Sequence, residues 1–181
     1  AYLISFPRSD DVNYNAEWGH GVQEYMNGWN TQKSKYTSFY LVGSYDSNIC
    51  YCIEPGVPLH ANDQLTQKGE DFWENYPSQY NHTIQPYEIK QFIGRIMQYG
   101  YTGKVSMSWR SNNEGGDKLA QAAATQLLIW ETVVGERDEN FNKVSPNGKN
   151  AILDQISPNH PLRAKIISYY NSIAENVQKH S

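Results

Sequence analysis

The sequence has little of what marks several common classes of protein. Its only two cysteines, Cys50 and Cys52, are too few for a disulfide scaffold or a zinc site. A disulfide between them would be strained, and we expect Cys50 to be a buried free thiol. Asp10 and Asp11 lack the spacing of a metal site with a histidine. The net charge of -4 and the charged share of 19% imply neither nucleic acid nor an anionic membrane surface as a partner.

The length and the remaining composition indicate a single globular domain. The chain of 181 residues is long enough to bury a hydrophobic core, and we assign 1–181 to one domain. No apolar run is long enough to span a membrane. The 14 tyrosines and the few lysines are typical of extracellular binding surfaces. The chain starts at Ala1 without a signal peptide, so we expect a mature or excised piece of a longer protein.

The apolar pattern predicts strands early in the chain and helices later. Pro86 suits the first turn of a helix, and Gly100 suits the end of that helix. We expect an α+β fold in which a small antiparallel β-sheet or partial barrel packs against several helices. The predicted strands are Tyr2–Phe6, Thr37–Tyr45 and Ile49–Glu54; the predicted helices are Pro86–Gln98, Leu119–Val134 and His160–Lys179, with short helices near Val22–Met26 and within Ala61–His82.

The predicted helix over 119–134 carries a glutamine on its apolar face. We expect a loop over 111–116 before it and Asp117 as its N-cap. A buried primary amide needs hydrogen-bond partners, or it costs on the order of 1–3 kcal/mol. Gln126 therefore either bonds main chain across the core, or offers its carbonyl carbon to a nucleophile. The face consists of Leu119, Ala123, Gln126, Trp130 and Val133, at helical steps of three and four.

Cys52 is the candidate nucleophile. Attack by its sulfur on the amide carbon of Gln126 would expel ammonia and leave an internal thioester. An isolated thiol and amide do not react in this way, but a fold that holds them in contact supplies roughly 7–11 kcal/mol through proximity. Trp130 lies one helical turn from Gln126 and is a candidate cover for the bond, since burial keeps water away. Tyr51 and Tyr101 are further candidate shields.

Two motifs resemble the signature of the thioester domains of Gram-positive surface adhesins. The sequence YCI at 51–53 is similar to the family's first motif, which places a cysteine between an aromatic or aliphatic residue and an aliphatic one. The sequence TQLLIW at 125–130 is similar to its second motif, Thr-Gln-x-x-x-Trp, although leucines stand where the family often has a small residue. The turn GYTG at 100–103 is also similar. The two motifs occur in the family's order.

The resemblance implies that Cys52 and Gln126 form the thioester and that Tyr51, Thr125 and Trp130 are motif residues around it. It implies a monomeric adhesin domain without cofactor or metal, outside the cell in a protein anchored to the bacterial cell wall. The partner would be a host surface or matrix protein, one of whose lysine amines attacks the acyl carbon of Gln126. Cys52 leaves and an amide link remains. This self-catalysed reaction occurs once per molecule, so the domain would not be an enzyme.

The attacking lysine must be neutral, against a reference pKa of about 10.4. A nearby base or desolvation is therefore needed. Glu54, His20, His60 and His82 are the candidate bases, and the sequence does not choose among them.

Two other functions remain open. A Cys/His acyltransferase or hydrolase would pair Cys52 with His60, His82 or His160. In such enzymes the cysteine commonly opens a helix, whose dipole lowers the thiol pKa, whereas Cys52 is predicted to close a strand. A non-covalent module would bind sugar or protein through its tyrosines and tryptophans, with Gln126 serving only the structure.

Overall fold

The computed structural model describes residues 2–6, 39–43, 48–53, 71–74, 84–105, 113–145, 152–153 and 162–180. These residues are mainly helical. The helices are α2 (Asp71–Glu74), α3 (Pro86–Tyr99), α4 (Asn113–Val134) and α5 (Arg163–Lys179), and the strands are β1 (Tyr2–Phe6), β2 (Phe39–Gly43) and β3 (Ile49–Cys50). No helix in the described ranges is both long and apolar enough to cross a membrane.

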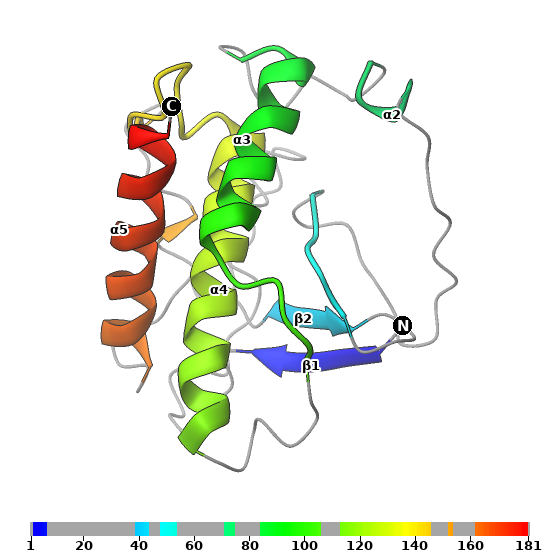
Figure 1. Cartoon of the computed structure of the whole chain (residues 1–181), viewed down its shortest axis with the longest axis vertical. Helices are drawn as coiled ribbons and strands as arrows, with labels where there is room; N and C mark the ends of the chain where they lie inside the picture. Colours follow the sequence, from blue (N-terminus) through cyan, green and yellow to red (C-terminus); the bar gives the residue numbers. More distant parts are fainter. Residues whose placement is uncertain are drawn as a thin grey trace, which may run out of the picture.

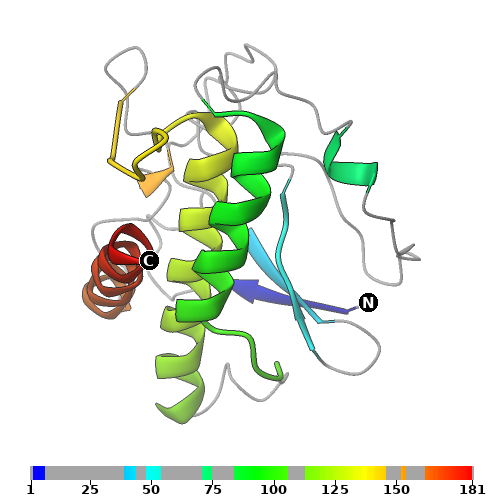
Figure 2. The ribbon, with the colours of Figure 1, turned by 45° about the horizontal axis from the view of Figure 1, so that its top comes forward.

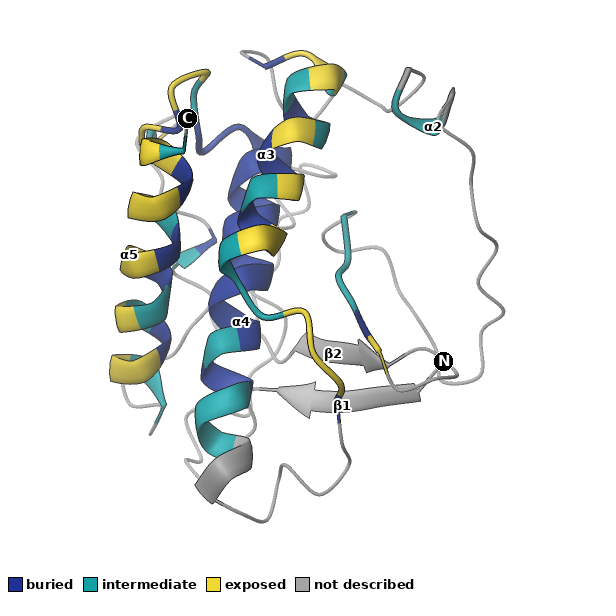
Figure 3. Ribbon diagram, viewed as in Figure 1, coloured by how far each residue is buried: buried dark blue, intermediate teal, exposed yellow. Residues whose placement is uncertain are grey.

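α4 is the central element of the described fold. α5 packs along one side of it, α3 packs on both of these helices, and the strands lie on the side of α4 away from α5, as Figure 1 and Figure 2 show. Every residue from 122 to 137 is buried (Figure 3). A helix that is buried all round belongs to the interior of a domain. Side chains in the middle of α4 are therefore held in place by packing from several neighbouring elements.

The three strands form a short antiparallel sheet in the order β1-β2-β3. On its free side, β3 meets the turn that follows α3. The Ile49 N–H donates to the Gly103 carbonyl at 3.2 Å. The chain that leads to Cys52 is therefore held between β2 and this turn. The paired positions include Tyr2 with Gly43, Val42 with Cys50, and Asn48 with Lys104.

The predicted helices before and after α4 are confirmed with small shifts. α3 begins at Pro86 as predicted and extends to Tyr99, with Gly100 as its C-cap. Its first turn is closed by a hydrogen bond from the Gln85 N–H to the Glu88 carboxylate at 3.2 Å. α5 begins at Arg163, three residues later than the predicted start.

The predicted start of α4 is wrong. The helix begins at Asn113 and runs through the glycines that suggested a loop over 111–116, so Asp117 lies inside it and is not its N-cap. Instead, the Asp117 carboxylate accepts a hydrogen bond from the Tyr169 hydroxyl of α5 at 2.8 Å. This contact between helices supports a first turn whose own sequence disfavours helix.

The strand predictions hold in part. β1 matches the prediction and β2 lies within the predicted range, but the third predicted strand is too long, because β3 ends at Cys50. The α+β class is not confirmed, since the described part is mainly helical and contains no barrel. The predicted short helix near 22–26 lies outside the described residues, as does most of 61–82, and the assignment of 1–181 to one domain stays a prediction.

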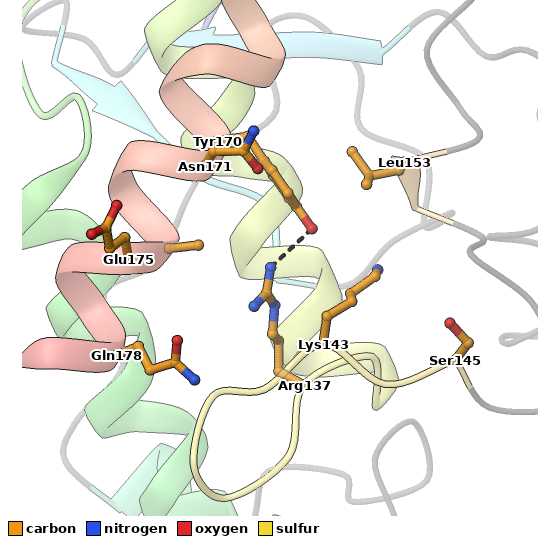
Figure 4. A pocket seen from close by; sticks show the side chains of 9 residues that line it. Arg137, Lys143, Ser145, Leu153, Tyr170, Asn171, Glu175 and Gln178 are labelled. Atoms are coloured by element: carbon orange, nitrogen blue, oxygen red, sulfur yellow. Dashed lines mark hydrogen bonds between the residues drawn. The ribbon is translucent and has the colours of Figure 1, made fainter.

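A buried cluster of charged groups joins the end of α4 to α5 and to the loop between them. The Glu131 carboxylate accepts hydrogen bonds from Arg137 Nε at 2.9 Å, Lys143 Nζ at 2.6 Å and the Tyr170 hydroxyl at 2.6 Å. The Tyr170 hydroxyl in turn accepts a hydrogen bond from Arg137 at 2.9 Å (Figure 4). Glu131 is fully buried and Arg137 is 6% exposed. Such charges stay buried only while each has its partners.

Replacing Arg137 should therefore destabilise the domain strongly. The Arg137→Met variant keeps the apolar bulk but removes two of the cluster's hydrogen bonds and leaves the Glu131 charge poorly compensated. We expect the free energy of unfolding in urea to fall by about 3–5 kcal/mol. The control is Lys179→Met, which breaks the Lys179–Glu175 pair, whose side chains are 72% and 63% exposed. Its unfolding midpoint should hardly move, and equal effects in the two variants would contradict this account.

Candidate functional site

The side-chain amide of Gln126 is bonded to the main chain of Cys52. Gln126 Oε1 accepts a hydrogen bond from the Cys52 N–H at 2.8 Å, and Gln126 Nε2 donates one to the Cys52 carbonyl at 2.8 Å. Gln126 is only 1% exposed, so these bonds satisfy an amide that water does not reach. Two residues 74 positions apart in the chain thus meet through two parallel bonds.

These two bonds fix the amide carbon opposite the Cα that carries the thiol. In Cys52 the N–H and the carbonyl flank Cα, and in Gln126 the atoms Oε1 and Nε2 flank Cδ. The two hydrogen bonds join the Cys52 N–H to Oε1 and the Cys52 carbonyl to Nε2, so Cδ faces the Cα of Cys52. Sγ is two covalent bonds from that Cα. The Cys52 N–H also points at the oxygen that becomes negative when a nucleophile attacks Cδ. A donor in that place acts as an oxyanion hole.

The sequence left two interpretations of Gln126 open, and this geometry bears on both. Hydrogen bonding to main chain across the core is observed. The main chain that Gln126 reaches, however, belongs to the candidate nucleophile itself. The two sequence motifs therefore meet through Cys52 and Gln126.

Neighbouring motif residues bind the turn that follows α3. Thr125 Oγ1 accepts a hydrogen bond from the Tyr101 N–H at 3.0 Å and donates one to the Gln121 carbonyl at 2.9 Å. The Tyr51 hydroxyl donates to the Tyr101 carbonyl. Burial raises the pKa of Tyr51 well above its ordinary value, so this hydroxyl keeps its proton and remains a donor. The main chain of Tyr101 is thus held on both sides by residues of the two motifs.

Gly100 makes the contact between this turn and α4 possible. A Cβ at position 100 would lie 2.4 Å from Thr125 Oγ1 and 2.7 Å from Thr125 Cγ2. The φ angle of Gly100 is -94°, which any residue adopts, so glycine is needed here for close approach and not for its backbone freedom. The sequence identified Gly100 as a helix end and as the first residue of the turn GYTG. Its packing on Thr125 depends on tertiary structure and left no local signal.

The residues around the pair keep bulk water away from the Gln126 amide. Leu119, Ala123, Trp130 and Val133 are all buried, with exposed fractions of 6%, 0%, 7% and 0%. The predicted apolar face of α4 is therefore confirmed. Cys52 and Tyr51 are half-buried and pack against the same core.

Comparison with protein families shows to which family the chain belongs. The thioester domain family matches residues 49–179. This chain belongs to the thioester domain family. The match runs from β3 to the end of α5 and includes both motifs. No curated protein and no solved structure matches significantly.

Several residues that the sequence analysis named as candidates lie outside the described part of the thioester domain. The candidate bases Glu54, His20, His60 and His82 lie outside the described residues, as do His160, Asp10 and Asp11. Within the described ranges, no three His, Cys, Asp or Glu side chains come together in a way that could hold a metal ion. Cys50 forms no disulfide with Cys52, as predicted, but it is half-buried rather than buried, and its thiol lies 3.8 Å from the Asn48 carbonyl oxygen.

The hydrogen bonds of Gln126 can be measured apart from any covalent bond. The Cys52→Ala variant of the thioester domain keeps the main chain to which Gln126 binds but has no thiol. In that background, Gln126→Leu should lower the free energy of unfolding by about 1–3 kcal/mol, because the N–H and the carbonyl of residue 52 lose their partners. Denaturant titration measures the difference. The matched control is Gln121→Leu on the half-buried side of α4, and a Gln126→Leu effect no larger than the control would contradict the assigned pairing.

Proposed function

We propose that Cys52 and Gln126 form an intramolecular thioester. Sγ of Cys52 attacks Cδ of Gln126, the bond from Cδ to Nε2 breaks, and the amide nitrogen leaves as ammonia with the proton of the thiol. The paired hydrogen bonds support this proposal best, because they align the reactants before any bond is made. The Cys52 N–H stabilises the oxyanion of the tetrahedral intermediate.

The proposed product is a reagent for amines. A neutral amine attacks the same carbon, the sulfur of Cys52 leaves and takes up the proton that the amine loses, and an amide link remains on Gln126. Membership of the thioester domain family supports this role in an adhesin. We propose a lysine of a host surface or matrix protein as the amine, and the outer face of a Gram-positive cell wall as the place of reaction. Each domain reacts once, so it is a covalent binder and not an enzyme.

A lysine that arrives as an ammonium must first lose a proton to become the attacking amine, and that proton needs a separate acceptor. The hydroxyl of Tyr51 does not serve, because burial raises its pKa and it is protonated at neutral pH. The carboxylate of Glu54 and the imidazoles of His20, His60 and His82 remain the proposed bases. Without a base, capture would depend on the small neutral fraction of the lysine.

Intact-mass measurement tests formation of the bond. Freshly purified protein that has met no amine should be lighter than its sequence by the mass of one ammonia. The Cys52→Ala variant should show its full calculated mass, because the nucleophile is missing. Wild-type protein at its full calculated mass would count against the thioester.

Reaction with methylamine tests the capture step and the identity of the sulfur. Methylamine should add to Gln126 and release one thiol to a labelling reagent, faster at higher pH because more of the amine is neutral. The Cys50→Ala variant should react like wild type, and the Cys52→Ala variant should not react. If Cys50→Ala abolishes the reaction instead, the sulfur is misassigned. With an added acyl substrate such as a glutamine-containing peptide, repeated conversion of that substrate to its methylamide would favour the acyltransferase alternative.

A further inference from the structure

We infer that the turn Gly100–Lys104 is a positioning element for the reactive pair and that it acts through the hydroxyl of Thr125. This inference rests on the proposed thioester. The turn is bonded to both chains that carry reacting atoms. On one side it binds the Cys52 chain through Ile49 and Tyr51, and on the other it binds α4 through Thr125.

The reaction breaks one of the direct contacts between the two chains. Before reaction, the Cys52 chain is held to α4 directly by the two hydrogen bonds of the Gln126 amide. When ammonia leaves, Nε2 goes with it, and the bond from Nε2 to the Cys52 carbonyl is lost. The bonds made by Thr125 and Tyr51 involve no reacting atom. They persist while the thioester forms, while the new bond between Sγ and Cδ joins the two chains, and after amine capture breaks that bond. They therefore hold the two chains in place at every stage.

The hydroxyl of Thr125, rather than its shape, is the active feature. Its oxygen accepts the Tyr101 N–H while its proton goes to the Gln121 carbonyl. Valine has almost the same shape but has neither the acceptor nor the donor. Serine keeps both and loses only a methyl group. The pair Thr125→Val and Thr125→Ser therefore separates the hydrogen bond from packing.

A second buried threonine on α4 provides the matched control. Thr132 is fully buried and donates to the Leu128 carbonyl at 2.8 Å, the same local bond that Thr125 makes to Gln121. Thr132→Val removes that local bond from the same helix but leaves the contact with Tyr101 intact. It controls for the general cost of replacing a buried threonine by valine.

The first arm of the test follows the loss of ammonia by intact mass at short times after cell-free synthesis. Thr125→Val should form the thioester about 10-fold more slowly than wild type, because small misplacements of reacting groups cost large factors in rate. Thr125→Ser and Thr132→Val should form it at the wild-type rate. The inference is overturned if Thr125→Val is as fast as wild type, or if Thr125→Ser or Thr132→Val is slowed as much as Thr125→Val.

The second arm does not depend on the thioester. In the Cys52→Ala background, amide hydrogen exchange at residues 52 and 101 should become faster with Thr125→Val and stay unchanged with Thr125→Ser. Unchanged exchange at residue 52 in the Thr125→Val variant would overturn the positioning role. If wild-type protein never loses ammonia, the proposed function fails, and this arm still decides whether the turn holds the two chains together.

Discussion

The pairing of the Gln126 amide with the main chain of Cys52 is the interaction on which this site depends. A primary amide buried in a protein avoids a large desolvation cost only where its N–H donors and its carbonyl acceptor have hydrogen-bond partners. In this fold they are met by the main chain of Cys52, the residue whose side chain is the candidate nucleophile. The same two bonds that remove the penalty of burial also set the approach of the reactants. The same two hydrogen bonds thus satisfy the buried amide of Gln126 and place its carbon near Cys52 for the proposed thioester.

The rest of the described fold keeps that arrangement rigid. α4 is packed by α3 and α5, and its C-terminal end is fixed by the ion cluster around Glu131, which follows Trp130 directly in the chain. Glu131 therefore anchors α4 little more than one turn beyond Gln126. On the other side, the turn after α3 ties the chain of Cys52 to α4. A pair held in this way would need little reorganisation to form the proposed thioester.

The sequence predicted the parts that have a local or periodic signal. The apolar face of α4, the polar residue within it and the limits of α3 follow from spacing and from Pro86 and Gly100. The meeting of Cys52 with Gln126 was inferred from the chemistry of the two side chains and from the resemblance of their motifs. The structure now brings the two residues together.

What the sequence did not predict depends on tertiary contacts. The first turn of α4 contains two glycines, yet it is helical, with the contact of Asp117 and Tyr169 supporting it. β3 ends before Cys52, which is bonded to a side chain of α4. The packing of Gly100 on Thr125 brings the turn after α3 against α4. None of these contacts has a signature in the residues next to it along the chain.

A crystal structure of wild-type protein, prepared without exposure to amines, tests the central claim most directly. The account predicts continuous electron density between Sγ of Cys52 and Cδ of Gln126, and no density for Nε2. An intact glutamine amide, hydrogen-bonded to the main chain of a residue whose thiol is free, would contradict it.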